Sequence, residues 1–173
     1  MDWLITVPCW GEKYIRQYLE VTLPTVNVAL ERIDGDIRFI VHTDRPEMFD
    51  RSAFRGSVEL RPIEIDDPYV TYGRANRDAL KSAKHGECVM LTGSDTIVSR
   101  EFFQCCERRF AEGYRAIFGT AARTIAEPHE IPIGMASRDL LDWSFRHRHP
   151  ATDGGFWGKG CNTQAWAIYF EGP

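Results

Sequence analysis

Three loops that follow apolar segments carry residue types suited to binding a charged ligand. Residues 4–7, 38–42 and 88–91 are each expected to form a strand, and they lead into Pro8-Cys9-Trp10-Gly11, Thr43-Asp44 and Gly93-Ser94-Asp95. Ligands of open α/β sheets bind beyond the carboxyl ends of the strands. We therefore expect one site that includes Pro8, Cys9, Trp10, Gly11, Asp44, Ser94 and Asp95.

Asp95 is the only carboxylate in the predicted loop over residues 92–96. Because Mg²⁺ can be held by one or two carboxylates together with phosphate oxygens and water, a single aspartate does not exclude a metal. The alternative is that Asp95 caps a turn before a helix that begins near Ser99. Asp44 has a comparable alternative, because an aspartate shortly before Pro46 is common in an ordinary turn.

Arg74 and Arg77 are candidates for binding a phosphate. They lie three residues apart in a segment with the helical spacing of alanine and leucine, so they share one face of a helix. Asn76 lies between them and joins the candidate set. A solvated helix end is the alternative explanation for one of the two arginines.

The elements that must position these residues alternate between strand and helix patterns. Apolar residues recur every three or four positions over residues 12–33, which predicts a long helix that is either kinked at Pro24 or divided there into two shorter helices. The order of elements predicts an α/β sandwich with a mostly parallel central sheet flanked by helices. The remaining predicted elements are strands at residues 58–65 and 116–119 and helices closed by Gly86 and Gly113, the second of them with Ser99 as its N-cap. A loop rich in aspartate and proline is expected from Asp66 to Pro68, before the first of these helices.

After about residue 122 the pattern weakens. Residues 135–146 are expected to form a helix and residues 162–170 a last strand. The ten residues from 151 to 160 contain four glycines and two aromatics, which predicts a mobile loop. The chain stops soon afterwards at Pro173, which leaves room for a longer parent protein.

Length and charge exclude several classes of protein. At roughly 150 residues per domain, the 173 residues make one domain, and 43% hydrophobic with 27% charged residues exclude intrinsic disorder. A net charge of −4 argues against a general nucleic-acid binder. No apolar run has the length of a membrane span, and the N-terminus has no signal-peptide pattern, so we expect a cytoplasmic protein.

The five cysteines are not expected to carry the chemistry. They are an odd number at irregular spacing without a CxxC pair, which fits neither a disulfide framework nor a zinc knuckle. We expect reduced thiols, mostly in the core. Only Cys9 lies in a predicted ligand loop, and no histidine is its neighbour in sequence, so a nucleophilic role is rejected.

Taken in order, these motifs resemble the GT-A glycosyltransferases, in particular the inverting, family 2-like enzymes that use nucleotide-diphosphate sugars. The resemblance covers residues 4–122. It lies in Pro8-Cys9-Trp10-Gly11-Glu12 after the first strand, Thr43-Asp44 after the second, Arg74-Ala75-Asn76-Arg77 before the strand that leads to Asp95, and residues 91–102, which are similar to the family pattern x-x-D-x-I-V-S-x-x-F.

The resemblance implies a single GT-A-like domain over residues 1–173, in which residues 1–122 bind a UDP- or GDP-linked sugar and residues 123–173 form the acceptor side. It implies that Asp44 contacts the base or ribose and that Asp95 contacts Mn²⁺ or Mg²⁺. The family has a second carboxylate beside the metal-binding aspartate, whereas here Ser94 precedes Asp95. Metal-independent binding of the diphosphate is therefore an alternative.

By the same resemblance, the catalytic base lies on the acceptor side. An inverting transfer needs a carboxylate that removes the proton of the acceptor hydroxyl during attack. Asp153 is the first candidate for this base, followed by Asp142 and Asp139.

Three ring side chains belong to the same region. Trp157 is expected to stack on a sugar ring or a base, with a role as core anchor as the alternative. His147 and His149 either contact a metal or a phosphate or lie on the surface.

The sequence thus predicts a glycosyltransferase that moves a sugar from a nucleotide-diphosphate donor to an unknown acceptor with inversion. The alternative is a nucleotide-sugar-binding GT-A-like module without transferase activity, because the second carboxylate is missing and the C-terminal part is short. A nucleotidyltransferase on a similar sheet ranks last. The glycine- and Arg/Lys-rich loop that cradles a triphosphate in such enzymes is not found between Pro8 and Lys13.

Overall fold

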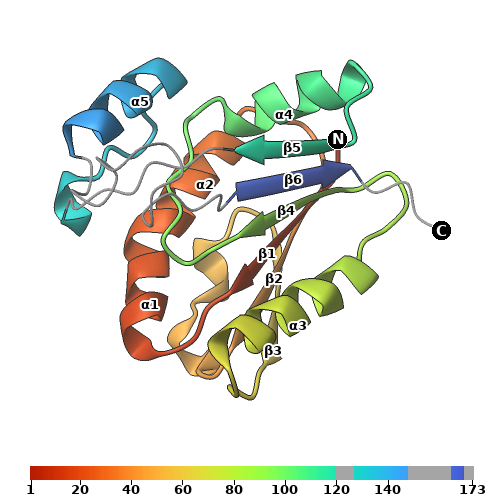
Figure 1. Ribbon diagram of the computed structural model, residues 1–173, viewed down its shortest axis with the longest axis vertical. Helices are drawn as coiled ribbons and strands as arrows, with labels where there is room; N and C mark the ends of the chain where they lie inside the picture. Colours follow the sequence, from red (N-terminus) through yellow and green to blue (C-terminus); the bar gives the residue numbers. More distant parts are fainter. Residues whose placement is uncertain (120–126, 148–164, 170–173) are drawn as a thin grey trace.

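A six-stranded mixed sheet organises the part of the chain that the structure describes. The computed structural model describes residues 1–119, 127–147 and 165–169 (Figure 1). The strand order is β3-β2-β1-β4-β6-β5. β1, β2, β3 and β4 run parallel to one another, and β6 pairs antiparallel with both β4 and β5. The strands are β1 (Trp3–Pro8), β2 (Ile37–Thr43), β3 (Ser57–Pro62), β4 (Cys88–Thr92), β5 (Ala116–Gly119) and β6 (Ala165–Tyr169).

Helices connect the parallel strands in the order that the sequence predicts. The α-helices are α1 (Glu12–Gln17), α2 (Leu23–Leu30), α3 (Pro68–Lys81), α4 (Phe102–Ala111) and α5 (Ser137–Arg146). Short 3₁₀ turns are η2 (Pro46–Met48), η3 (Arg51–Ala53) and η4 (Pro128–Glu130). The predicted α/β architecture with a mostly parallel sheet is therefore confirmed. No helix in these ranges combines the length and apolar character of a membrane span.

The predicted long helix over residues 12–33 is three consecutive helical segments. A π-helical turn, η1 (Tyr18–Thr22), joins α1 to α2, and Pro24 lies in the first turn of α2. Proline has no N–H to bond to the carbonyl four residues earlier, so a wider turn directly before it relieves the backbone. The interruption that the sequence predicts at Pro24 is thus a π turn on its N-terminal side.

The structure differs from the sequence prediction at three element boundaries. α3 begins at Pro68, inside the segment predicted as a loop, because the Asp67 carboxylate accepts the N–H groups of Tyr69 and Val70 and Pro68 needs no N–H partner. Ser99 does not cap α4, whose N-cap residue is Glu101. The third difference is the end of β3, which lies at Pro62 and not at the predicted residue 65.

Helices cover both faces of the sheet. Figure 1 shows α3 on one side and α2 with α4 on the other. On the α3 side, Leu4, Ile40 and Val89 pack with Ala79. The larger core lies on the opposite side, where Trp3 of β1 meets Phe103 of α4 edge to face, with ring centroids 4.8 Å apart. β1 is buried along its whole length because both of its faces are covered, which explains its continuous apolar sequence.

Candidate functional site

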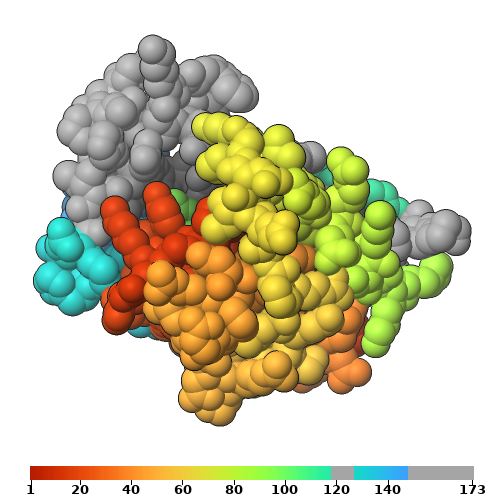
Figure 2. Space-filling view, turned by 90° about the horizontal axis from the view of Figure 1, so that it is seen from below, coloured from red at the N-terminus to blue at the C-terminus, as the bar shows by residue number. Residues whose placement is uncertain are grey.

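The candidate site lies where the order of strands in the sheet reverses. β1 pairs with β2, the next strand in sequence, on one edge and with β4 on the other. In open α/β sheets the crevice outside the carboxyl ends of such a strand pair is the usual place for a ligand. Figure 2 looks at the molecule from the end where α1 (red), the residues after β2 (orange) and the start of α3 (yellow) gather.

The loop after β1 is joined to the end of β2 by two hydrogen bonds. The N–H of Cys9 donates to the carbonyl of His42 over 2.8 Å, and the N–H of Gly11 donates to Oδ1 of Asp44 over 3.0 Å. Gly11 has a φ of 77°, a conformation in which a side chain would be strained. The glycine thus lets the chain turn into α1 while its N–H faces the Asp44 carboxylate.

The thiol of Cys9, in the loop after β1, is buried. Burial, together with the charges of Asp44 and then Asp95, raises the pKa of Cys9 to about 12. β1 lies between β2 and β4 and runs parallel to both, so the loops that carry Cys9, Asp44 and Asp95 leave the sheet at the same edge. Both carboxylates are exposed.

α3 adds one predicted and one unpredicted residue to this place. Burial raises the pKa of Tyr72, the charge of Asp95 adds to this effect, and a hydrogen bond from Asn76 opposes it. Tyr72 and Asn76 are four residues apart, so they lie on the same face of α3. The Oδ1 atom of Asn76 is buried and has no hydrogen-bond partner among the described residues. Sequence reasoning missed Tyr72, although its spacing from Asn76 is a signal that could have found it.

The two arginines of α3 have different surroundings. Nη2 of Arg74 lies 2.7 Å from Oδ2 of Asp66, in an exposed ion pair with the loop before α3. Arg77 is exposed and has no ion pair within the described parts of the chain. Of the two candidates for phosphate, Arg77 is the one whose guanidinium is not already matched by a carboxylate there.

The loop that carries Asp95 is held from the α1–α2 side. The Thr22 hydroxyl donates to the carbonyl of Ser94 over 2.9 Å. Thr22 ends the π-helical turn η1, so this turn contacts the residue directly before Asp95. Of the remaining residues of the β1 loop, Pro8 is buried as the last residue of β1 and Trp10 is half-buried beside Cys9.

The acceptor-side candidates are described only in part. Asp153, Trp157 and His149 lie outside the described residues. Asp139 and Asp142 are exposed on α5. The His147 ring stacks on Trp143, with centroids 4.5 Å apart and planes at 22°, and its Nδ1 lies 2.9 Å from the Trp143 carbonyl. This packing places His147 against its own helix.

The donor atoms near Asp95 fit a shared cation rather than a closed protein cage. No group of three or more His, Cys, Asp or Glu side chains placed to hold a metal occurs in residues 1–119, 127–147 and 165–169. One exposed carboxylate is a suitable contact for Mg²⁺ or Mn²⁺ when phosphate oxygens and water complete the coordination. Any metal at Asp95 would thus depend on the ligand that brings those oxygens.

The described cysteines have the inert character that the sequence predicts. Cys9, Cys88 and Cys106 are buried free thiols, whereas Cys105 is exposed. Burial raises the pKa of each of the three buried thiols to about 12. Because the thiolate is the nucleophile, none of the three is activated for catalysis.

We expect iodoacetamide at pH 8 to label Cys105 well before Cys9, Cys88 or Cys106. The reason is that the three buried thiols are both shielded and protonated at this pH. Peptide mapping of the folded protein measures the order of labelling, and urea-unfolded protein, in which all four react, is the control. Labelling of Cys9 as fast as Cys105 would contradict the buried position of the β1 loop.

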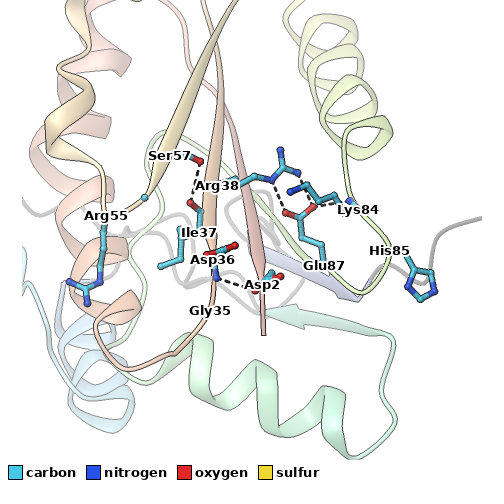
Figure 3. Close-up of a pocket in the computed structure, with 11 residues that line it drawn as sticks. Asp2, Gly35, Asp36, Ile37, Arg38, Arg55, Ser57, Lys84, His85 and Glu87 are labelled. Atoms are coloured by element: carbon cyan, nitrogen blue, oxygen red, sulfur yellow. Dashed lines mark hydrogen bonds and ion pairs between the residues drawn. The ribbon is translucent and has the colours of Figure 1, made fainter.

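A hollow of about 680 Å³ lies at the opposite, amino edge of the sheet (Figure 3). None of the predicted site residues lines it. Glu87 is 3% exposed there, and its carboxylate is paired with Arg38 through two contacts of 2.9 Å and accepts the N–H of Lys84. The most buried charge in this hollow is thus already neutralised, and we place the candidate site at the carboxyl edge.

Comparison with known proteins supports the fold. No protein-family model and no curated protein matches the sequence. A solved structure of 4-diphosphocytidyl-2C-methyl-D-erythritol synthase from Anaerococcus prevotii matches 97% of this chain and 71% of its own, with a TM-score of 0.51 and 13% identity. The fold is GT-A-like.

Further structures with weaker likeness are of TarS from S. aureus. Residues 1–349 of TarS match with a TM-score of 0.47 and 15% identity, over 71% of this chain and 41% of that one. The same segment in complex with UDP-GlcNAc gives 0.43 and 17%, over 65% and 32%. This chain thus spans less than half of either TarS structure, and at such identities the likeness concerns the fold alone.

Proposed function

We propose that this protein binds a nucleotide-diphosphate sugar, linked to UDP or GDP, and transfers the sugar to an acceptor with inversion. The observation that carries the proposal is the position of the loops with Gly11, Asp44 and Asp95 at the switch point of the sheet, where the N–H of Gly11 donates to Asp44. In this proposal, residues 1–122 bind the donor and residues 123–173 form the acceptor side.

The nucleoside is proposed to lie across the ends of β1 and β2. One carboxylate oxygen of Asp44 accepts the N–H of Gly11, so the other oxygen is available to a ribose hydroxyl or a base N–H. Pro8, Cys9 and Trp10 form the wall of this part of the site. An exposed carboxylate held by a backbone N–H is a preorganised acceptor, which suits recognition of a hydroxyl pair or an amide edge.

The diphosphate is proposed to lie beside Ser94 and Asp95, with Asn76 and Arg77 on the α3 side and Arg74 further out. A divalent cation at Asp95 would neutralise the charge that develops on the departing diphosphate. Arg77 supplies positive charge on the same side whether or not a cation is bound. The buried Oδ1 atom of Asn76, which has no hydrogen-bond partner among the described residues, is available to a donor group of the ligand.

The acceptor is activated by a carboxylate. In an inverting transfer the acceptor oxygen attacks the anomeric carbon, its proton passes to the base, and the bond between that carbon and the diphosphate oxygen breaks. Asp153 is proposed as this base, with Asp142 and Asp139 behind it. Trp157 is proposed to stack on the sugar or the base.

The second candidate function is a nucleotide-sugar-binding module that does not transfer the sugar. The observation that favours it is the residue before Asp95, since a serine stands where the family has a carboxylate. Donor hydrolysis, measured with and without Mn²⁺, separates the two functions, because a module binds the donor without releasing the sugar.

We expect one nucleotide diphosphate out of UDP, GDP, dTDP and CDP to raise the melting temperature clearly above the others. A ligand at 100 times its Kd stabilises the folded state by about 2.7 kcal/mol, which a thermal-shift assay resolves easily. Each nucleotide is tested at millimolar concentration with and without Mn²⁺, with inorganic phosphate as the control. Absence of any shift would contradict the proposed site.

Replacing Asp95 by asparagine is expected to weaken the Mn²⁺-dependent part of diphosphate binding and to leave the melting temperature near wild type. Asp95 is exposed at a loop and packs in no core cluster, so its charge contributes to the ligand more than to folding. Titration calorimetry with the preferred diphosphate measures the change, and the exposed Asp34→Asn at the amino edge is the matched control. A variant that unfolds, with unchanged affinity in its folded fraction, would support the turn-capping role instead.

A further inference from the structure

α5 begins without a capping side chain of its own. Its N-cap residue is Ala136, which offers no acceptor to the first N–H groups of the helix. A carboxylate from 36 residues earlier takes this place. Oε2 of Glu101 accepts the N–H of Ser137 over 2.9 Å and the Ser137 hydroxyl over 3.0 Å.

Further contacts surround this cap. The Ser137 hydroxyl also lies 2.9 Å from that of Ser99, and the N–H of Arg100 donates to the carbonyl of Met135 over 2.9 Å. Nε of Arg100 lies 3.2 Å from the other Glu101 oxygen. The start of α5 is therefore bound to three consecutive residues of the segment that leads into α4.

The Glu101 carboxylate is held in its charged form. Burial alone would raise the pKa of Glu101, but the hydrogen bonds from the Ser137 N–H, the Ser137 hydroxyl and Arg100 outweigh burial and lower it. A negative charge at a helix N-terminus is stabilised by the helix dipole. Glu101 thus contacts α5 as an ionised group.

The same segment carries Asp95 and is fixed at its other end. Thr22 bonds to the carbonyl of Ser94, and the N–H of Val98 donates to the Thr25 hydroxyl over 3.4 Å in a buried contact. Residues 94–101 therefore connect the α1–α2 side, through Asp95, to the first turn of α5. This segment is therefore the covalent path between the Asp95 loop and the cap of α5, and it is anchored at both ends.

We propose that Glu101 is a positioning residue that holds α5, with Asp139 and Asp142, in a set place relative to Asp95. This inference rests on the proposed function, because the proposed function assigns the acceptor side to the part of the chain that contains α5. The donor would bind at the loop that carries Asp95. The contact of Glu101 with Ser137 would then fix the orientation of α5, on the acceptor side, relative to that loop. Loss of the contact should then lower turnover more than donor affinity.

The test compares Glu101→Gln and Ser137→Ala with a matched variant on α4. Glutamine keeps the size of Glu101 but loses its charge and one acceptor, and alanine removes only the Ser137 hydroxyl. Glu112→Gln, at the C-cap of α4, is the control, because Glu112 is exposed and its partner is Arg109 in the last turn of α4. Ser137→Thr keeps a hydroxyl and is expected to behave as wild type.

We expect Glu101→Gln to lower kcat by on the order of tenfold or more, since small misplacements of reacting groups have such effects. The Kd for the preferred diphosphate should stay within about twofold, and the double variant with Ser137→Ala should be little worse than the worse single variant, because both act through one contact. A kcat no lower than that of Glu112→Gln, or an equal loss of kcat and diphosphate affinity, would overturn the inference.

Hydrogen exchange supplies a readout that needs no turnover. In unliganded protein, Ser137→Ala should speed amide exchange both in α5 and in residues 94–98, whereas Glu112→Gln should change neither. Faster exchange confined to α5 would mean a simple helix cap and overturn the coupling. If the wild-type protein binds no nucleotide diphosphate, the proposed function fails, while this exchange result still decides whether Glu101 couples the two segments.

Discussion

Asp153→Asn is expected to lower kcat by about 10²- to 10⁴-fold, which is the contribution of a general base in the transition state. Asparagine keeps the shape of the side chain but cannot accept the acceptor proton. Affinity for the nucleotide diphosphate should stay near wild type, because the base contacts the acceptor. Steady-state turnover of the donor and titration with the diphosphate separate the two quantities.

The comparison variants are Asp142→Asn and Asp139→Asn on α5. Both residues are exposed and lie in the helix whose first turn Glu101 caps. A two- or three-fold effect at Asp153 together with a large effect at one of these would move the base to α5. Mild effects at all three positions would favour the binding module over the transferase.

Arg38→Met is expected to lower the free energy of unfolding by about 3–5 kcal/mol, the usual result of leaving a buried charge without its partner. Glu87 is 3% exposed, and Arg38 supplies both of its ion-pair contacts. The remaining donor, the N–H of Lys84, does not carry a charge. Urea unfolding followed by tryptophan fluorescence measures the loss.

The double variant Arg38→Met with Glu87→Leu tests the cause. Replacing both partners of a buried ion pair by apolar residues is often neutral, so the double variant should recover most of the stability. Glu87→Leu alone should cost less than Arg38→Met, because the side chain of Arg38 is 24% exposed and reaches water. A loss below about 1 kcal/mol for Arg38→Met, the range of surface ion pairs, would mean that water from the hollow in Figure 3 solvates Glu87.

The alternation of strands and helices was open to prediction because its signals are local. The apolar run of β1 can be recognised from six consecutive residues, and the helical pattern over residues 12–33 from apolar residues three or four positions apart. The polar loops after β1, β2 and β4 follow from the same patterns, and with them the choice of Asp44 and Asp95. The start of α3 could also be predicted, because an aspartate followed by proline is a typical N-cap and first residue of a helix. The acidic, proline-containing composition of this segment favoured a loop instead.

What the sequence determined by itself was thus which elements form and which side chains stand at their ends. Only the tertiary structure decided that Asp44 accepts the N–H of Gly11, that Arg74 is paired with Asp66, and that Ser99 meets Ser137 rather than its own helix. The contact of Glu101 with α5 spans 36 residues, and that of Thr22 with Ser94 spans 72. The physical reason is that the periodicity of apolar residues lies within a single element. A hydrogen bond across such separations forms only after the hydrophobic faces of several elements have packed and brought donor and acceptor together.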